Sequence, residues 1–241
     1  MSSIALVTGA NRGLGRATAI ALAQAGHHVV IAGRNVSATE CLAQELRAEG
    51  LAAESLQLDV TDRDSVTRAA RTLAERHGRV DVLVNNAGIL PEATVTTPPA
   101  FVDADALIAT LRTNVVGVAL VLEAFAPLLR RSASGRVVNV SSRMGSVADQ
   151  LDETSPFHGM VLPAYQASKA AVNSLTAGLS KHLASDGVRV VSVCPGFVQT
   201  ELTPMNHDQA PLTAEQAAKT VLGALEAPTG SFVDADGVVP W

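Results

Sequence analysis

The segment Ile4-Ala-Leu-Val-Thr-Gly-Ala-Asn-Arg-Gly-Leu-Gly15 sets the architecture of this chain. Residues 4–8 are apolar or β-branched and predict a short buried strand, and an apolar pattern of helical period then continues to Ala25. Between the two, Gly9, Gly13 and Gly15 would let a pyrophosphate approach the backbone at the positive end of the helix. A plain tight turn is the alternative, but the position between a strand and a helix favours nucleotide binding.

The alternation of strand and helix continues along the chain. Six more strands are predicted at residues 28–32, 55–58, 80–84, 136–140, 188–193 and 231–233. Besides the first helix, helices are predicted at about 37–50, 62–77, 103–131, 165–185 and 213–226. This order predicts one α/β domain over residues 1–241, a Rossmann fold whose doubly wound, seven-stranded parallel sheet is flanked by helices. Ligands are expected at the carboxyl ends of the strands.

Composition excludes several classes of protein. A hydrophobic content of 47% in 241 residues is enough for a sizeable core. The net charge of -5 and the pI near 5.6 argue against nucleic-acid and anionic membrane partners. No unbroken apolar run reaches the ~18 residues of a membrane span, and the strand pattern from Ile4 leaves no room for a signal peptide. We therefore expect a cytoplasmic protein.

Neither the cysteines nor the histidines predict a metal site or a disulfide. Cys41 and Cys194 are far apart and lack a CxxC partner. No ligand spacing such as HExxH occurs among the six histidines, which are His27, His28, His77, His158, His182 and His207. We therefore expect reduced thiols and solvated or capping histidines.

Tyr165 is the only tyrosine in the chain and stands four residues before Lys169. At this spacing both side chains leave the same face of a helix. The reference pKa of a phenol is about 10, and an ammonium group beside the phenol would lower that pKa by favouring the phenolate. The pair indicates a proton donor or acceptor, and an amphipathic helix with an incidental tyrosine and lysine is the alternative.

Arginines stand where an NAD-specific Rossmann fold would carry an acid. The second strand is followed by Arg34, about 20 residues after the glycine turn, and no Asp or Glu is there to bind a ribose 2′-hydroxyl. Arg34 and Arg12 would instead make charge-assisted contacts with a 2′-phosphate. We therefore expect NADPH to be preferred over NADH, the alternative being that both are ordinary surface arginines.

Small polar residues occur at three further positions. Asn85-Asn86-Ala87-Gly88 follows one strand and suits a cofactor site, although a simple turn would look the same. Ser141-Ser142 ends another strand. Asn114 stands in an otherwise apolar helix, where a buried amide needs partners, and neighbouring backbone groups are the alternative to a functional role.

Together these features resemble the short-chain dehydrogenase/reductase (SDR) family over essentially the whole chain. The matching motifs, in the family's order, are Thr8-Gly-Ala-Asn-Arg-Gly-Leu-Gly15, Asp59-Val60, Asn85-Asn-Ala-Gly88, Asn114, Ser141-Ser142, Tyr165-x-x-x-Lys169 and Pro195-Gly196. The resemblance implies an NAD(P)-dependent oxidoreductase acting on an alcohol or a carbonyl group. It does not choose the substrate.

The resemblance also implies a role for each matching residue. Tyr165 would protonate a carbonyl oxygen, Lys169 would lower the tyrosine pKa and hold the nicotinamide ribose, and Ser142 would polarise the carbonyl. Asn114 would bend its helix and hold a water that links Lys169 to solvent. Besides Tyr165 and Lys169, the cofactor would contact Gly9, Asn11, Arg12, Gly13, Leu14, Gly15, Arg34, Asp59, Val60, Asn86, Ala87, Gly88, Pro195, Gly196, Val198 and Thr200.

The chain departs from the family's common pattern before Tyr165. Ser142 and Tyr165 lie 23 residues apart, more than in typical members, so residues of about 143–164 would form a lid-like insertion beside a substrate loop at about 197–212. Similar insertions occur in members resembling carbonyl reductases, and the ending at Trp241 looks like that group. The insertion is shorter than in that group's monomeric members, so we expect a homodimer or homotetramer built partly from two long helices.

Apolar side chains gather in the loops expected to border the substrate, namely Phe101, Phe157, Phe197, Met144, Met160 and Met205. Such adaptable groups favour a hydrophobic ketone or aldehyde, although loops also need apolar anchors. Arg143 leaves an acidic substrate open. We assign the substrate site to Ser142, Met144, Phe157, Tyr165, Phe197 and Met205.

The leading prediction is an NADPH-dependent reductase of ketones or aldehydes. One alternative is an alcohol or hydroxysteroid-type dehydrogenase, and another is a β-ketoacyl reductase. A non-enzymatic NADP-sensing regulator is a third, but it would not need the proton donor that Ser142, Tyr165 and Lys169 together supply.

Overall fold

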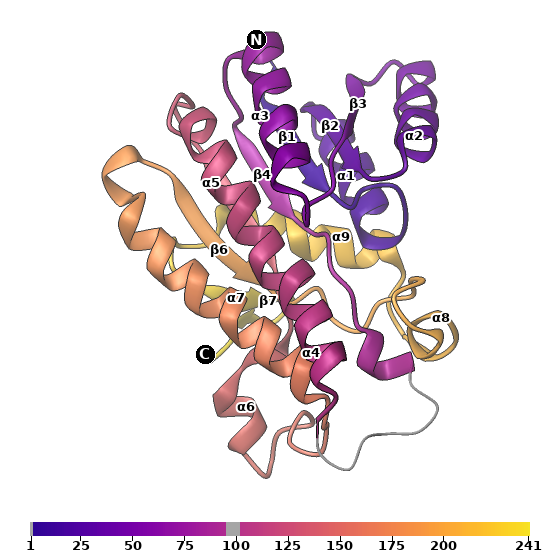
Figure 1. The fold of residues 1–241 in the computed structure, drawn as a ribbon, viewed down its shortest axis with the longest axis vertical. Coiled ribbons are helices and arrows are strands. Elements are labelled where there is room, and N and C mark those ends of the chain that lie inside the picture. The colour runs from indigo at the N-terminus through magenta and orange to yellow at the C-terminus, as the bar shows by residue number, and fades with distance from the viewer. Residues whose placement is uncertain (1, 95–101) are drawn as a thin grey trace.

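One twisted sheet of eight strands forms the centre of the protein (Figure 1). The computed structural model describes residues 2–94 and 102–241. The strand order is β3-β2-β1-β4-β5-β6-β7-β8, and neighbours are parallel except for β7 and β8. The strands are β1 (Ile4–Thr8), β2 (His28–Gly33), β3 (Ala53–Gln57), β4 (Val82–Asn85), β5 (Arg136–Val140), β6 (Arg189–Val193), β7 (Phe232–Asp234) and β8 (Gly237–Val238).

The predicted doubly wound α/β domain is confirmed, but the predicted strand count was one too low. β8 folds back on β7 and pairs with it through Val233 and Val238. It has two residues, too few to show the alternation that identifies a strand in a sequence. The sheet is therefore eight-stranded and mostly parallel, with one antiparallel edge.

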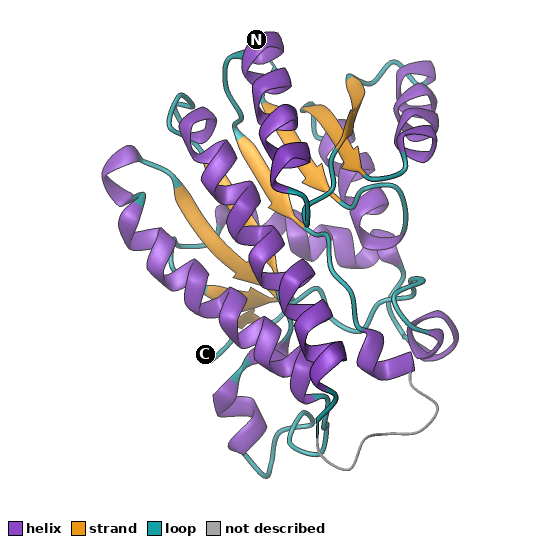
Figure 2. Ribbon diagram, in the orientation of Figure 1, coloured by secondary structure: helices purple, strands orange, loops and turns teal. Residues whose placement is uncertain are grey.

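Helices cover both faces of the sheet (Figure 2). In Figure 1, α3, α5 and α7 lie in front of the strands, and α1 and α9 lie behind them. The α-helices are α1 (Gly13–Gln24), α2 (Val36–Ala48), α3 (Arg63–His77), α4 (Ala104–Leu111), α5 (Gly117–Leu129), α6 (Val147–Leu151), α7 (Pro163–His182), α8 (Pro204–Gln209) and α9 (Ala214–Gly223). Short helical turns are η1 (Pro91–Thr94), η2 (Arg112–Val116), η3 (Arg143–Gly145), η4 (Ala184–Asp186) and η5 (Ala224–Glu226).

The alternating side chains of the strands fill a separate core on each face. In β1, Leu6 packs in the cluster that contains Val121 and Phe125 of α5. Its neighbours Ala5 and Val7 pack in the cluster of the opposite face, with α1 and α9. A parallel sheet covered on both faces must be apolar along its whole length, which explains the continuous apolar runs in the sequence.

The predicted helix over 103–131 contains a wider turn. α4 and α5 are joined by η2, a π-helical turn that includes Asn114, so the helical segment runs from Ala104 to Leu129. A π-turn inserts an extra residue and shifts the faces of the helix on either side of it. The residues before and after η2 therefore face the sheet differently from those of a regular helix.

The segment Ala104–Leu129 is long and apolar enough to cross a membrane by length and composition, with a mean hydropathy of 1.6 in its most apolar window. The sequence expectation concerned unbroken apolar runs and is not contradicted, because Arg112 and Glu123 interrupt this segment. A core helix passes the same test. Val118, Val121 and Phe125 lie in the core against the sheet, as such a helix requires.

Two short helices lie in segments predicted to be irregular. α6 lies in the segment before Tyr165, where the Ser146 hydroxyl accepts a hydrogen bond from the Asp149 amide. α8 lies in the predicted substrate loop, where Thr203 accepts from Asn206. Both caps are recognisable local signals, but each helix is too short to show an apolar face.

Asp81, the residue directly before β4, connects three segments of the chain. Its carboxylate accepts hydrogen bonds from the Ile4 amide at 2.7 Å and the Ser132 hydroxyl at 2.6 Å, and Arg79 lies 3.1 Å away. Burial raises the pKa of Asp81, but the hydrogen bonds from Ser132 and Ile4 and the charge of Arg79 outweigh burial and hold the pKa below its usual value. The ionised form therefore stabilises the fold.

Replacing Asp81 by Asn should lower the free energy of unfolding by about 2 kcal/mol at neutral pH, because buried donors lose a charged acceptor. The pKa of Asp81 is lower in the folded state than in the unfolded state. The contribution of Asp81 to stability is therefore fully present above the unfolded-state pKa and is lost as the pH falls through the folded-state pKa. Urea denaturation at pH 7 and at about pH 3 should show the difference shrinking. Asp236→Asn, at an exposed carboxylate, is the control. Equal stability of D81N and the parent protein at pH 7 would contradict this account.

Candidate active site

The glycine turn lies at the carboxyl end of β1, where the strand order reverses between β1 and β4. Position 15 must be glycine, because a Cβ there would lie 2.4 Å from the Asn86 amide nitrogen and 2.5 Å from the Gly9 carbonyl oxygen. α1 has no side-chain cap and no acidic residue in its first turn. Its first N–H groups and its dipole therefore remain for an anionic ligand, which fits the pyrophosphate of a dinucleotide.

Asn86 locks the end of β4 to the glycine turn. Its Nδ2 donates to the carbonyl oxygens of Thr8 (2.9 Å) and Gly9 (3.2 Å). The Thr8 hydroxyl in turn accepts hydrogen bonds from the backbone amides of Asn86 and Ala87. The Asn86 side chain thus shapes the glycine turn, and its role toward a cofactor would be to hold this backbone in place.

The two arginines predicted to select NADPH are exposed and available. Neither the Arg12 side chain nor the Arg34 side chain makes a hydrogen bond or ion pair with any residue that the structure describes. Their loops are adjacent, because the Ala10 amide donates to the Ala32 carbonyl oxygen at 3.0 Å. Two unpaired guanidinium groups therefore stand on neighbouring loops at the same end of the sheet.

A cavity of about 230 Å³ opens beside these loops. It joins the glycine turn, the loop after β4 and the loop after β6, and its lining residues are Arg12, Gly88, Ile89, Leu90, Pro91, Thr94 and Leu202. All three loops follow the carboxyl ends of strands, where ligands bind in doubly wound sheets.

The other predicted cofactor residues lie in loops at the same end. Thr200 covers the glycine turn, since a Cβ on Gly13 would lie 3.1 Å from its methyl group. Asp59 accepts hydrogen bonds from the amide and hydroxyl of Thr61, which fixes the loop after β3. Asn11 lies beside the end of β2. The remaining residues occupy α1 or the loops after β3, β4 and β6, and are Leu14, Val60, Ala87, Gly88, Pro195, Gly196 and Val198.

Tyr165 and Lys169 lie on one face of α7, as predicted. The Lys169 Nζ is 5.4 Å from the centroid of the Tyr165 ring and donates a hydrogen bond to the Val140 carbonyl oxygen at 2.8 Å. Lys169 is only 6% exposed. Its ammonium group is thus held between the end of β5 and the tyrosine ring.

Ser142 is the serine of the pair that reaches Tyr165. Its hydroxyl is close enough to the phenol to lower the pKa of Tyr165, and its Oγ accepts a hydrogen bond from the Met144 amide at 3.2 Å. Ser141 points elsewhere and donates to the Asn173 Oδ1 at 2.7 Å inside the core. The structure therefore brings Ser142, Tyr165 and Lys169 together.

Gly145 permits this arrangement by letting η3 approach α7 closely. A Cβ on Gly145 would lie 2.6 Å from both the carbonyl carbon and the Cβ of Lys169. No side chain fits there, so the turn that begins after Ser142 lies directly on the backbone of the helix that carries Tyr165 and Lys169. The sequence prediction missed this contact because Gly145 is isolated in a segment without a periodic pattern.

Burial controls the charge of both α7 groups. Burial raises the pKa of Tyr165 above its usual value, the Cys194 thiol adds to this, and the hydrogen bond with Ser142 opposes it. Burial also lowers the pKa of Lys169 to about 8. The sequence-based expectation that the ammonium group lowers the tyrosine pKa is not seen here. The reason is that the ammonium group donates to Val140 and that burial dominates the shift.

Asn114 is fully buried at the π-turn and is bonded mainly to backbone. Its Oδ1 accepts from the Ile89 amide at 2.9 Å, and its Nδ2 donates to the Ile89 carbonyl oxygen at 3.0 Å and to the Ser168 hydroxyl at 3.1 Å. Asn114 lies within the widened helical turn η2. The amide thus ties the loop after β4 to the catalytic helix α7.

Cys194 is a residue of this site that the sequence prediction did not assign. It follows β6 directly, is 6% exposed, and lies near enough to Tyr165 and Lys169 to influence their pKa values. Burial raises the pKa of its thiol. Its position immediately before Pro195-Gly196 was the available signal, and the lack of a second nearby cysteine hid it.

The predicted substrate residues occupy different environments. Met144 is buried, and Phe157 packs below the Arg143 guanidinium with 5.2 Å to the ring centroid. Phe197 and Met205 are exposed by 41% and 57% in the loop after β6. Met160 is also exposed, and Phe101 lies outside the described residues.

The first part of the segment before Tyr165, residues 143–149, is held by polar contacts. Arg143 forms hydrogen bonds with Asp149 at 2.8 and 3.1 Å and with Asp234 at 3.4 Å. The Ala148 amide donates to the Trp241 carbonyl oxygen, and Trp241 stacks on Phe232. The C-terminus therefore braces this insertion against β7.

The sequence matches a known family along most of its length. The family model described as short chain dehydrogenase covers residues 3–210. A 3-oxoacyl-[acyl-carrier-protein] reductase of Synechocystis sp. is 36% identical over 84% of this chain and 76% of that protein. The short-chain dehydrogenase anuI of Penicillium roqueforti is 33% identical over 92% of this chain and 87% of that protein.

Solved structures show the same relationship. The NADPH-bound carbonyl reductase from chicken fatty liver superimposes with a TM-score of 0.85 at 27% identity, over 100% of this chain and 99% of that one. A 3-ketoacyl-ACP reductase from Sinorhizobium meliloti has a TM-score of 0.78 at 30% identity, over 96% of this chain and 97% of that one. The protein therefore belongs to the short chain dehydrogenase family and is an NAD(P)-dependent oxidoreductase.

Proposed function

We propose that this protein reduces the carbonyl group of a ketone or aldehyde to an alcohol with NADPH. The observation that carries the proposal is the convergence of Ser142 and Tyr165 next to the buried Lys169. A protonated phenol, a neutral hydroxyl and an ammonium group converge at the carboxyl ends of the strands. This set can protonate an oxygen on which negative charge develops.

In this mechanism Tyr165 is the general acid, and its raised pKa keeps it protonated across the working pH range. Ser142 donates a hydrogen bond to the substrate oxygen. Lys169 places positive charge near the tyrosine ring, and it would hold the ribose of a bound nucleotide. A bound NADPH would supply the hydride to the carbonyl carbon. Asn114 would anchor the water that links Lys169 to solvent, as the resemblance implies.

The loops around the glycine turn would hold the cofactor. Uncapped N–H groups at the start of α1 would bind its pyrophosphate, and Arg12 and Arg34 would bind its 2′-phosphate. The unpaired state of both arginines supports NADPH over NADH. Asp59, Asn86 and Thr200 would shape the rest of this site.

A hydrophobic, uncharged substrate is favoured. Arg143, the one cation of the insertion, pairs with Asp149 and Asp234 and so is not free to bind an acidic group. Phe197 and Met205 expose apolar surface in the loop after β6. The insertion, residues 143–164, would act as a lid over this substrate.

A β-ketoacyl reductase is the second candidate function. The similarity to the Synechocystis and Sinorhizobium reductases supports it, whereas the full-length match to the chicken carbonyl reductase supports the first. A dehydrogenase that works toward oxidation would use the same residues in reverse.

A panel of ketones, ketoacyl thioesters and secondary alcohols, assayed by NADPH absorbance, separates the carbonyl reductase, the β-ketoacyl reductase and the dehydrogenase. Turnover of any of these substrates would also exclude an NADP-sensing regulator. A cytoplasmic location is part of the proposal.

Replacing Tyr165 by Phe should reduce kcat for ketone reduction by about 10²–10⁴-fold, because the proton donor is lost while the ring stays in place. NADPH binding, measured by fluorescence titration, should remain within about threefold of the parent protein, because the ribose and phosphate contacts persist. Turnover at the parental rate in Y165F would refute the proposed role.

The rate of reduction should fall as the pH rises through about 8. Lys169 has a lowered pKa of about 8, so its ammonium form is lost above that value while Tyr165, with a raised pKa, remains protonated. The free-enzyme profile of kcat/KM between pH 6 and 10 measures this. A profile that is flat across pH 8 would contradict the assignment of this decrease to Lys169. The same decrease near pH 8 in Lys169→Met would also contradict it.

Replacing Arg34 by Ala should lower the ratio of kcat/KM for NADPH to that for NADH by about 10–100-fold, the value of a charged hydrogen bond to phosphate. Steady-state kinetics with both cofactors measure the ratio. Arg71→Ala, at an arginine exposed on α3, is the control and should leave the ratio unchanged. An unchanged ratio in both R34A and R12A would remove the proposed preference.

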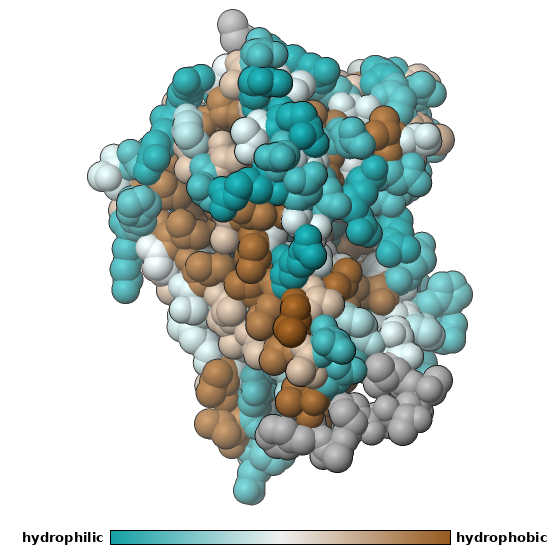
Figure 3. Space-filling view, in the orientation of Figure 1, coloured by the Kyte–Doolittle hydropathy of each residue, from teal (hydrophilic) through white to brown (hydrophobic). Residues whose placement is uncertain are grey.

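The protein should form a homodimer or homotetramer built partly from its two long helical segments, Ala104–Leu129 and α7, as we propose. Ile108 and Val116 expose 64% and 49% of their surface, and hydrophobic residues gather on this face of the molecule (Figure 3). Burial of such a patch is favourable. Light scattering measures the mass in solution, and a monomeric mass at micromolar concentration would contradict the proposal.

A further inference from the structure

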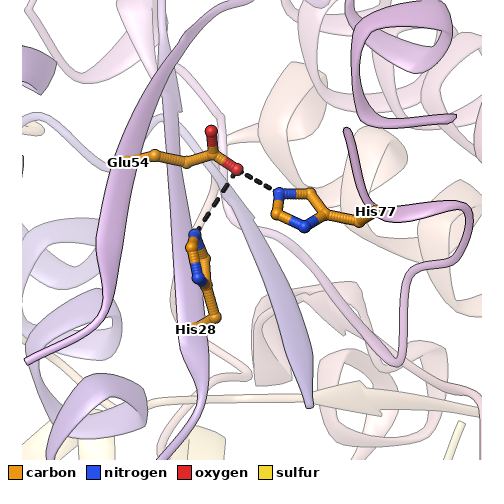
Figure 4. Close-up of side chains that lie close together, drawn as sticks. All are labelled: His28, Glu54 and His77. Atoms are coloured by element: carbon orange, nitrogen blue, oxygen red, sulfur yellow. Dashed lines mark hydrogen bonds and ion pairs between the residues drawn. The ribbon is translucent and has the colours of Figure 1, made fainter. Parts of the chain in front are cut away.

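A cluster of two histidines and a glutamate lies at the amino ends of β2 and β3 (Figure 4). His28 is the first residue of β2, Glu54 is the second residue of β3, and His77 is the last residue of α3. Glu54 pairs with Val30, so its side chain shares a face of the sheet with those of Val30 and His28. α3 packs on that face and its end brings His77 to the same place. The sequence prediction of solvated or capping histidines missed this convergence, because it joins three separate elements.

The ligand atoms of the three side chains point at one another. His28 Nε2 lies 3.5 Å from Glu54 Oε1, and His77 Nε2 hydrogen-bonds to the same oxygen. All three atoms lie within 4.8 Å of one another. Figure 4 shows both imidazoles turned toward the one carboxylate oxygen. Such a set of two imidazoles and one carboxylate is a common protein ligand set for zinc.

One of these atoms lacks a hydrogen-bond partner. His28 Nε2 is buried and makes no hydrogen bond with any of the residues that the structure describes. A buried polar atom without a partner is rare and costs free energy, unless a ligand satisfies it. The three side chains as wholes keep 17–26% of their surface exposed, so an ion and a coordinating water can reach them.

The glutamate is prepared as a single-oxygen ligand. Its second oxygen, Oε2, accepts a hydrogen bond from Arg76 at 2.7 Å, which leaves Oε1 for the histidines. Burial raises the pKa of Glu54, but hydrogen bonds from His77 and Arg76 outweigh it and hold the pKa below its usual value. Arg76 thus orients the carboxylate, as outer hydrogen-bond partners do in metal sites.

We propose that His28, Glu54 and His77 form a binding site for a divalent transition-metal ion such as Zn²⁺, with the fourth position taken by water. Tetrahedral ligands about 2.0–2.1 Å from zinc are about 3.3 Å apart, close to the separation of His28 and Glu54. Small side-chain rotations of His77 complete the set. Two nitrogen ligands disfavour Mg²⁺ and Ca²⁺, which prefer oxygen.

The ion would have a structural role. Tyr165 and the glycine turn lie at the carboxyl ends of the strands, whereas the cluster lies at the amino ends of β2 and β3. A metal there would cross-link two strands to α3 without entering the reaction. An ion that binds only the folded state raises its stability.

Zinc titration of the tag-free, chelator-treated full chain by calorimetry tests this proposal, with the metal content measured by plasma mass spectrometry. Every protein carries Cys41→Ser, because Cys41 is an exposed thiol. One zinc per chain is expected, with affinity more than tenfold weaker in both Glu54→Gln and His77→Gln. His158→Gln, at a histidine outside the cluster, is the control and should bind as the parent does. Zinc should also raise the Tm of the parent and not that of the two cluster variants.

Failure of the parent chain to bind zinc would overturn the proposal, and so would equal affinity in H77Q. Either result would mean that the three residues form only an ion pair. Circular dichroism shows whether each variant folds, and His28→Gln replaces any variant that does not, because it removes the atom without a hydrogen bond. Ketone turnover should be the same in the parent and H77Q.

A second, independent observation concerns the start of α7. Glu92 is 8% exposed, and its carboxylate accepts hydrogen bonds from the amides of Ala164, at 3.1 and 3.2 Å, and of Tyr165, at 3.2 Å. The N-cap residue Leu162 has no capping side chain, and Pro163 has no N–H group. Glu92 therefore caps the helix from 72 residues away in sequence.

We infer that Glu92 is a positioning residue for Tyr165, an inference that rests on the proposed function. Its charge is favourable at a helix N-terminus, and its bonds fix the first turn of α7 against the loop after β4. Removal of the carboxylate would leave buried N–H groups unpaired next to Tyr165. The tyrosine would then lose its alignment with Ser142.

Steady-state kinetics of Glu92→Ala and Glu92→Gln test this role. We expect kcat to fall at least tenfold in E92A and less in E92Q, which keeps one acceptor oxygen, with the KM for NADPH unchanged in both. Glu75→Gln, at an exposed glutamate of α3, is the control. Parental kcat in a folded E92A would overturn this inference alone if Y165F is inactive, whereas an active Y165F would overturn the proposed function.

Discussion

The parallel pairing of β1 with both β2 and β4 is the constraint on which the rest of the structure depends. Backbone groups in a sheet buried on both faces must be paired, and parallel strands direct their carboxyl ends to one edge. Because the chain turns in opposite directions on the two sides of β1, its crossovers leave that edge open between β1 and β4. Thr8 and Asn86 bridge this opening and hold the glycine turn. The loops after β3 and β6, and the helix α7 that carries Tyr165, then reach it from neighbouring strands.

Burial sets the chemistry at that edge. An exposed tyrosine and lysine would keep ordinary pKa values, but here desolvation raises the pKa of Tyr165 and lowers that of Lys169. The Val140 carbonyl oxygen and the Ser142 hydroxyl supply the polar contacts that make this burial tolerable. The close approach of η3 to α7 at Gly145 holds Ser142 and Lys169 in the positions that these contacts require. The packing at the junction between β5 and α7 therefore also sets the pKa values of Tyr165 and Lys169.

The two ends of the sheet differ in the groups that they collect. At the carboxyl ends, small residues and hydroxyl groups lie in open loops, which suits a ligand that binds reversibly. The amino ends of β2 and β3 gather His28, Glu54 and His77 in a tight cluster between secondary structure elements. That placement suits a bound ion that stabilises the fold, because rigid elements fix ligand positions better than loops do.

The sequence alone determined the alternation of strands and helices, the family, and the spacing that places Tyr165 and Lys169 on one helical face. These follow from local periodicity and from motifs within a few residues, and the fold and the family are confirmed. The roles of the individual site residues stay predictions. Only the tertiary structure showed that η3 lies directly on α7 at Gly145, and that Glu92 caps α7. It alone joined His28 and His77 to Glu54, because contacts between separate elements depend on how the sheet and helices pack and leave no periodic signal in the chain.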